Sequence, residues 1–437
     1  MYYGADGNNR PFRVFNVFEE IDEPGEWYID RTGGKMYFYP YATTDPTPSF
    51  RMSKANYDLI SVQNASYITF YGLEVTGGKK KGIVINGGTQ NRIDSCDINT
   101  FETQGVSITG GSDNGICNSS VYNTGTGGII LNGGDKASIT PAGNFVTNNH
   151  IHDFSFLKES YAPAVNLGGV GNKVDHNEIY NAAHQAISFA GVDNVMEYNV
   201  FHDVCTNAAD MGAIYSGRSL ADHDNIIRYN HFYDIGNPSN TNMKPCAVFI
   251  DDGSSDVYVY GNVFGAGIEA CEANKINGGM RNSFTHNLYI DVPHVMRMSD
   301  WPNATWQASV LGDRVPTLRD SFNSVKNNPL YLARWPWLEG QKQASTMTYH
   351  PNVLGNNVIF YIGQTKPSNW AQISGHDGHT ISGLTSNLFV SGNTAANKAY
   401  FVDYANGNYA LTEAAYAMIR QTIPDFETIP FEEMGTY

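Results

Sequence analysis

Positive charge is scarce in this sequence. Lys and Arg total 27 against 43 Asp and Glu, which gives a formal net charge of −16 over 437 residues. An acidic chain is repelled by nucleic-acid phosphates and by anionic bilayers. We therefore expect no nucleic-acid partner and no membrane partner, and a neutral substrate is easier to accommodate.

Paired cysteines and long apolar runs are also missing. No run of 18 apolar residues predicts a transmembrane helix, and the start "MYYGADGNNR" lacks the basic and then apolar segments of an export signal. The cysteines contain no CxxC pair, which argues against a zinc site and a dense disulfide framework. We expect small buried thiols at all five positions: Cys96, Cys117, Cys205, Cys246 and Cys271.

Charged residues are few overall, at 16%, whereas aromatic residues reach 13% and there are 44 glycines. This balance favours a protein rich in strands and turns over a helical bundle. The length suits two or three average domains, but it also suits one elongated array of repeats, because stacked repeats escape the usual size limit on a single core.

A short phrase, apolar-x-x-Asn-x-apolar, recurs through the middle of the chain. Successive copies are 28, 22, 31, 32 and 25 residues apart, and two earlier copies carry Cys96 and Ser119 in place of Asn. This spacing is typical of one solenoid turn, in which stacked Asn amides bond to each other and to the backbone of a sharp bend. The predicted ladder consists of Asn149, Asn177, Asn199, Asn230, Asn262 and Asn287.

A second short strand follows each copy, as in "PAVNLGG", "QAISFAG", "GAIYSGR" and "CAVFIDD". Two or three short strands per turn predict an all-β fold, a parallel β-helix. Because strand side chains alternate between faces, eight residues should point into the coil. They are Val165, Leu167, Ile187, Phe189, Ile214, Val248, Ile250 and Ile276.

The two ends differ from the repeats. Residues 1–50 contain "EWYIDRTGGKMYFYP", which predicts a β-hairpin in a cap region. We expect the parallel β-helix over 51–304, and final coils, long loops and a tail over 305–437, all within one continuous structural domain. One short helix is predicted in the tail, from Thr412 to Gln421.

Aligning the second strands places outward residues in columns, with about 4.8 Å between neighbouring strands. Tyr215, Arg218, Asp251, Asp252 and Lys275 then stand around a floor of small residues. We interpret this group as a groove with a polar cluster. The floor is predicted from two sets: Gly168, Ala190 and Gly217 toward the strand ends, and Ala164, Ala186, Ala213 and Ala247 before the strands.

A second polar group is predicted at the strand entrance, where Asp210 lies beside His184 and roughly beside Lys244. A straight strand would separate Asp210 from Asp251 by roughly 20 Å, too far for two carboxyl groups to act on one bond, so a bend or a folded loop is required.

Simpler interpretations stay open for each of these residues. Asp251, Asp252 and Gly253 fit a turn, Asp210 fits a loop end, and His184 fits a surface or loop histidine. A calcium ion at the carboxylate cluster is a further option.

Several stretches resemble a known group of proteins. They include "EWYIDRTGGKMYFYP", "VNLGGVGNKVDHNEIYNAAHQAISFAG", "DMGAIYSGR", "FIDDGSSDVYVYGNVF" and "IPFEEMG". Together they resemble right-handed parallel β-helix carbohydrate-active proteins, nearest to glycoside hydrolase family 141, from about residue 12 to the end.

The resemblance implies hydrolysis of plant-type glycans, with fucosidase and xylanase activities, by a pair of aspartates on the helix face. The best matches are Asp210 and Asp251, with Asp252 as the alternative. It also implies an extracytoplasmic parent protein, with further coils before the hairpin.

We therefore predict a glycoside hydrolase that acts on an oligo- or polysaccharide. Asp210 and Asp251 would supply the acid and the base or nucleophile, and His184, Tyr215, Arg218 and Lys275 would bind the sugar or tune the carboxyl groups. No cofactor is required, although Ca²⁺ stays an option. The alternatives are a polysaccharide lyase on the same fold, which would use the cations to neutralise a uronate, and a non-catalytic glycan-binding β-helix.

Overall fold

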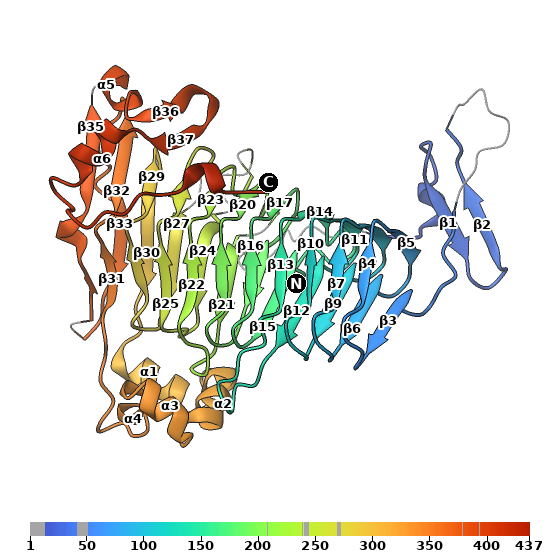
Figure 1. Cartoon of the computed structure of the whole chain (residues 1–437), viewed down its shortest axis with the longest axis horizontal. Helices are drawn as coiled ribbons and strands as arrows, with labels where there is room; N and C mark the ends of the chain where they lie inside the picture. The colour runs from blue at the N-terminus through green and yellow to red at the C-terminus, as the bar shows by residue number, and fades with distance from the viewer. Residues whose placement is uncertain are drawn as a thin grey trace.

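The computed structural model describes residues 14–41, 51–207, 209–237, 239, 244–268, 272–377, 379–392 and 394–437. Three parallel sheets of 11 strands each wind into a right-handed β-helix, as predicted. Figure 1 shows the coils stacked from the blue N-terminal part to the orange C-terminal part, with the hairpin standing apart at one end. None of the described helices is long and apolar enough to span a bilayer.

Each coil contributes one strand to each sheet. Sheet 1 contains β3 (Ile60–Gln63), β6 (Ile83–Asn86), β9 (Val106–Thr109), β12 (Ile129–Gly133), β15 (Val165–Gly169), β18 (Ile187–Phe189), β21 (Gly212–Gly217), β24 (Cys246–Asp251), β27 (Glu272–Asn277), β30 (His294–Ser299) and β33 (Ala371–Ser374). Sheet 2 contains β4 (Thr69–Tyr71), β7 (Arg92–Asp94), β10 (Gly115–Cys117), β13 (Phe145–Thr147), β16 (Lys173–Asp175), β19 (Val195–Glu197), β22 (Asn225–Arg228), β25 (Val257–Tyr260), β28 (Ser283–Thr285), β31 (Asn352–Gly355) and β34 (Ile381–Ser382). Sheet 3 contains β5 (Glu74–Gly78), β8 (Asp97–Phe101), β11 (Ser120–Thr124), β14 (His150–Phe154), β17 (Glu178–Tyr180), β20 (Val200–His202), β23 (His231–Phe232), β26 (Val263–Phe264), β29 (Leu288–Ile290), β32 (Val358–Ile362) and β35 (Leu388–Gly392).

The asparagine ladder is confirmed at the turn between sheets 2 and 3. Each member is fully buried, and its Nδ2 donates to the Oδ1 of the member in the next coil at 2.9 to 3.0 Å, from Asn149 to Asn287. The same contacts continue to Asn357 and Asn387. In the earlier coils the Ser119 hydroxyl replaces the amide and accepts from the backbone N–H of Cys96. The ladder oxygens also accept from the backbone N–H of the preceding member, so these buried N–H groups at the bends are bonded.

A second asparagine ladder, which the sequence analysis missed, runs along the turn between sheets 1 and 2. Its members are at most 1% exposed, and the amide oxygen of one accepts from the backbone N–H of the member before it, for example Asn194 from Asn172 at 3.0 Å. Each lies five residues before a position of the first ladder, which is a signal the sequence contains. They are Asn91, Asn114, Asn144, Asn172, Asn194, Asn225, Asn282 and Asn352.

The core fills the interior of the coil. All eight residues predicted to point inward are at most 3% exposed. Aromatic rings stack along the axis, from Phe201 to Phe232, Phe264 and Tyr289, with centroids 4.8 to 5.0 Å apart. Cys96, Cys205 and Cys246 are buried and Cys117 is partly buried, whereas Cys271 lies outside the described residues.

Four helices occupy residues 303–340, where we expected long loops: α1 (Asn303–Val310), α2 (Pro316–Val325), α3 (Pro329–Arg334) and α4 (Trp337–Gly340). They lie below the stack in Figure 1. Leu318 and Phe322 pack with Val192 and Leu220 of the turns between sheets 1 and 2. The fully buried Asp256 also anchors this helical insert, because it accepts from the Trp337 indole at 3.0 Å while pairing with His223 and Arg281.

The C-terminal part covers the outward face of the last strands of sheet 3. It contains α5 (Thr394–Lys398), β36 (Phe401–Asp403), β37 (Asn408–Leu411) and the predicted tail helix, α6 (Glu413–Ile419), capped by the Thr412 hydroxyl. Residues 422–437, here named the C-terminal strap, then run back along the coils (Figure 1). The strap ends where the Tyr437 N–H donates to Asn148 Oδ1 at 2.9 Å.

Short elements complete the chain. The predicted hairpin is formed by β1 (Trp27–Asp30) and β2 (Lys35–Phe38), which pair antiparallel. Four 3₁₀ turns are present among the described residues: η1 (Phe18–Glu20), η2 (Leu384–Ser386), η3 (Tyr404–Asn406) and η4 (Phe431–Glu433).

Candidate active site

The outward face of sheet 1 carries the columns that the sequence predicts. Tyr215, Phe249 and Lys275 are register partners across β21, β24 and β27, and Gly217 pairs with Asp251. The predicted alanine half of the floor is wrong. Ala164, Ala186, Ala213 and Ala247 are fully buried, because their methyl groups pack among the core residues instead of facing solvent.

Asp251 lies at the end of β24 and is only 5% exposed. Its Oδ2 accepts from the Tyr215 hydroxyl at 2.8 Å, and its Oδ1 accepts from the Asn277 amide at 2.9 Å and the Asp252 N–H at 2.8 Å. Burial raises the pKa of Asp251, and the neighbouring charge of Asp252 raises it further, against the opposing effect of these hydrogen bonds. The site therefore holds a carboxyl group that keeps its proton to a higher pH than an ordinary aspartate.

Asp252 occupies a different environment from its neighbour. Its Oδ2 forms an ion pair with Arg218 at 2.7 Å, and its side chain is 21% exposed. Asp252 and Gly253 both have positive φ, and the Ser254 N–H donates to the Asp251 carbonyl at 3.0 Å. The predicted turn is thus confirmed as a tight turn of the type that needs two left-handed residues. This turn holds Asp252 beside Arg218 of the previous coil.

Asp210 reaches the same face from the loop before β21. Its Oδ1 forms an ion pair with Lys275 Nζ at 2.8 Å. Lys275 lies over the Phe249 ring at 4.2 Å, and on the other side Tyr215 packs edge-on against Phe249. The loop therefore folds over the strand instead of continuing its line. The negative charge of Asp210 also contributes to the raised pKa of Asp251, after burial and Asp252.

His184 packs against Tyr161. It is 4% exposed, its Nδ1 accepts from the Tyr161 N–H at 3.3 Å, and the Tyr161 ring packs against it. Burial lowers the pKa of His184 to about 4, so its imidazole is neutral at pH 7. The His184 carbonyl accepts from the Cys205 N–H at 3.0 Å, and both contacts match the simpler interpretation of a satisfied loop histidine.

Two residues of the cluster escaped the sequence analysis. Asn277 donates to Asp251 and also to Asp252 at 3.2 Å, and its amide oxygen accepts from the Trp301 indole at 3.0 Å. The sequence offers little to single out Asn277, because an amide alone is no chemical signal. Trp301 follows β30 and leads into the helical insert. Its contact with Asn277 therefore depends on a segment that the repeat does not predict.

The insert closes one end of this site. Gly253, in the turn after the two carboxylates, lies against Leu318 and the Trp306 ring, where a Cβ atom would come within 2.8 Å. Since Gly253 also has φ +88, a larger residue is excluded for two reasons. The site therefore combines a rigid floor of strands with a wall of helices.

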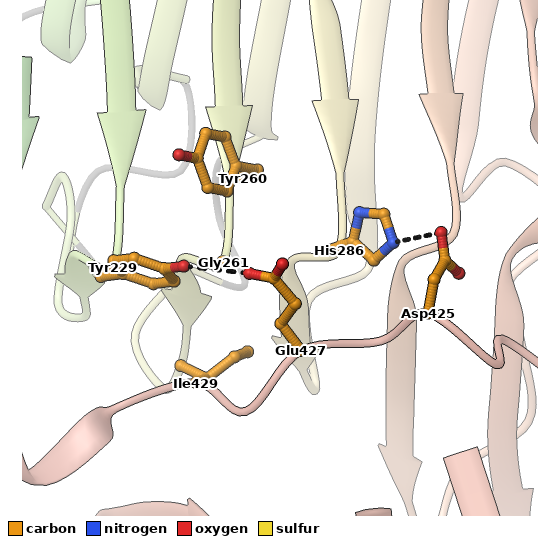
Figure 2. A pocket seen from close by; sticks show the side chains of 7 residues that line it. All are labelled: Tyr229, Tyr260, Gly261, His286, Asp425, Glu427 and Ile429. Atoms are coloured by element: carbon orange, nitrogen blue, oxygen red, sulfur yellow. Dashed lines mark hydrogen bonds and ion pairs between the residues drawn. The ribbon is translucent and has the colours of Figure 1, made fainter. Parts of the chain in front are cut away.

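A separate cavity of about 320 Å³ lies under the C-terminal strap. Figure 2 shows Glu427 next to Tyr229, and Asp425 pointing to His286, with Tyr260 above them. Tyr229 donates to Glu427 at 3.3 Å, and His286 lies 3.5 Å from Asp425. This cavity contains carboxylates, but it lies at the turns after sheet 2 and does not include the cluster around Asp251.

Within the described ranges, no group of three or more His, Cys, Asp and Glu side chains is close enough to hold a metal ion. Calcium at the carboxylate cluster stays a prediction. The cations nearest to the cluster, Arg218 and Lys275, are each paired with one of its carboxylates.

One family model matches part of the chain, and two solved structures show a distant similarity. The family model described as "Right handed beta helix region" matches residues 58–141. A solved structure described as "Glycoside hydrolase" is similar over 70% of this chain and 59% of its own, with 14% identity and a TM-score of 0.45. A second, "The complex structure of XylC with xylose", is similar over 85% and 64%, with 12% identity and a TM-score of 0.42. This chain thus spans less than two thirds of either structure, and no curated protein matches it.

Proposed function

We propose that this β-helix is a glycoside hydrolase whose site is the carboxylate cluster on the outward face of sheet 1. The observation that carries the proposal is Asp251, a buried carboxyl group with a raised pKa beside Asp252, on a face where Asp210 pairs with the Lys275 that lies over the Phe249 ring. Glycosidases need one carboxyl group that can donate a proton and a second that acts as base or nucleophile. Carboxyl groups in different environments are the usual means of separating these roles.

In this proposal Asp251 is the general acid, because its raised pKa keeps it protonated to higher pH. Asp210, whose side chain is 46% exposed and paired with Lys275, is the base or nucleophile. Asp252 is the alternative to Asp251, since it lies in the same turn and its side chain is 21% exposed. A carboxyl separation of about 5.5 Å would favour retention of configuration, and one of about 6.5 to 9.5 Å would favour inversion.

The substrate would be a neutral or weakly charged plant-type glycan. Fucosidase-like and xylanase-like action rests on the sequence resemblance around "DMGAIYSGR" and "FIDDGSSDVYVYGNVF". Arg218 has a side chain that is 42% exposed beside Asp252, so it would be the main cation able to contact sugar hydroxyls. Tyr215 is buried, and it would tune Asp251 instead of binding sugar.

The test is a screen of aryl glycosides and plant polysaccharides, with product analysis, on the wild type and on Asp210→Asn and Asp251→Asn. Each substitution should lower kcat by about 10² to 10⁴-fold without unfolding the protein, because general acid and base catalysis contribute about that much. Glu427→Gln, in the cavity of Figure 2, is the matched control and should stay active. A fully active Asp210→Asn/Asp251→Asn double variant would sink the assignment.

Two other outcomes of the same screen identify the alternatives. A polysaccharide lyase would release an unsaturated product that absorbs in the near ultraviolet, and it would act only on uronate polymers. To neutralise a uronate, a lyase would first have to break an ion pair, since Arg218 is paired with Asp252 and Lys275 with Asp210. Binding of a polysaccharide without any product would favour a non-catalytic glycan-binding protein.

A further inference from the structure

A cavity of about 480 Å³ lies on a different face of the β-helix, over the outward side of sheet 3. From β26 onward this side is covered by the C-terminal part, which packs on Val263 and Leu288. The cavity lies where that cover ends, between His231 and Tyr233 of the coil and Asn406, Asn408 and Phe431 of the cover. Its volume falls in the range of small-molecule sites, about 300 to 1,000 Å³.

A column of stacked rings leads along sheet 3 to this cavity. The rings belong to successive coils and lie 4.7 to 4.9 Å apart, in the order Tyr122, His152, Tyr180, His202 and Tyr233. Neighbouring rings cover both faces of each interior member. Tyr233 ends the column, because the corresponding residue of the next coil is Gly265, which has no ring. Tyr233 is thus an aromatic residue of the column that also lines the cavity.

His231 is the unusual residue of the lining. It is 8% exposed, and its Nε2 is buried without a hydrogen-bond partner in the described part of the chain. Burial lowers the pKa of His231 to about 3, so the ring is neutral at pH 7 and can donate or accept one hydrogen bond. Leaving a buried polar atom unpaired costs free energy, and such atoms are rare unless a ligand or ordered water completes them.

The rest of the lining is uncharged. Of the residues described around the cavity, none is Asp, Glu, Lys or Arg. The Asn406 and Asn408 amides are held in place by Asp403 at 2.6 Å and Glu432 at 3.0 Å, which lie outside the lining. Aromatic rings, amides and a neutral imidazole suit a ligand with one apolar C–H face and a rim of hydroxyl groups.

We propose that this cavity is a non-catalytic binding site for a neutral sugar residue, which stacks on Tyr233 and bonds to His231 Nε2. The proposal does not depend on hydrolysis at sheet 1, since the two sites share no residue. A glycan bound here would be held on sheet 3 while the carboxylate cluster faces outward from sheet 1.

The experiment is saturation-transfer difference NMR on the full chain with xylose, L-fucose, galactose and glucose, and with indole as an aromatic probe that is not a sugar. At least one sugar should bind with a Kd in the millimolar range. His231→Phe should weaken it at least tenfold while keeping or raising the Tm, because it removes an unpaired polar atom from an apolar site. Tyr233→Ala, at the partly exposed end of the column, should weaken sugar binding as well. It tests the site even if the His231→Phe variant does not fold.

The control is Glu427→Gln, which alters the neighbouring cavity under the same strap and should bind sugar as the wild type does. The proposal is overturned if no sugar binds, if only indole binds, or if neither His231→Phe nor Tyr233→Ala changes sugar affinity.

Discussion

Replacing Asp251 by Asn should increase stability at neutral pH while removing activity. Burial and the Asp252 charge raise the pKa of Asp251 in the folded protein above its unfolded value of about 3.9. A group of this kind stabilises the fold below the unfolded pKa, and that contribution is lost as pH rises through the folded pKa. Asn cannot ionise, and its amide can still accept from the Asp252 N–H and Asn277 and face the Tyr215 hydroxyl.

The size of this effect follows from general constants. Each unit of pKa elevation corresponds to about 1.4 kcal/mol. An unfolding entropy of about 2.1 cal/mol/K per residue gives roughly 0.9 kcal/mol/K for a chain of 437 residues. Each unit should therefore change the Tm by about 1.5 °C.

The assay is differential scanning calorimetry of the wild type and Asp251→Asn from pH 4 to pH 8.5 at one scan rate. The Tm of the variant minus that of the wild type should increase with pH and then level off above the folded pKa of Asp251. A difference that is constant or that falls with rising pH would refute the raised pKa, and with it the choice of Asp251 as the acid.

Three further predictions concern the same network and the scaffold. Asp252→Asn removes a charge that raises the pKa of Asp251, so the alkaline limb of its pH–rate profile should move to lower pH. Tyr215→Phe removes a hydrogen bond that lowers the same pKa, so its alkaline limb should move to higher pH. Asp256→Ala should cost about 3 to 5 kcal/mol in urea unfolding at pH 7, because it leaves the fully buried His223 ring and the Trp337 indole without their acceptor and Arg281 without its carboxylate. The pKa of Asp256 is lowered in the folded protein. Its contribution to folding stability is therefore present above the unfolded pKa and is lost as pH falls through the folded pKa, so the free-energy cost of Asp256→Ala should shrink in acid. A cost that is constant between pH 7 and pH 3 would contradict this. Asn230→Ala should cost at least about 2 kcal/mol, measured the same way, because it leaves the buried backbone N–H of Asn199 without its acceptor and the Met196 and Arg228 carbonyls without the Asn230 amide donor. An unchanged midpoint would contradict the structural role of the ladder.

The repeat was predictable because it depends on short-range rules. An Asn at each bend bonds to the Asn of the next coil, and residues such as Val248 and Ile250 alternate with outward residues along one strand. The same rules placed Tyr215 beside Phe249 and Gly217 beside Asp251. The second ladder follows an equally local rule, since its members recur five residues before positions of the first.

The amino-acid sequence by itself determined the β-helix, the inward and outward faces and the column in which Asp251 stands, because neighbouring coils repeat the same local bonds. Tertiary structure decided which charges meet. Asp210 and Lys275 are 65 residues apart and come together only because a loop folds over the strand, and Trp301 reaches Asn277 from a segment outside the repeat. The raised pKa of Asp251 arises in the same way, since it depends on burial by several coils and on charges that no local pattern brings together.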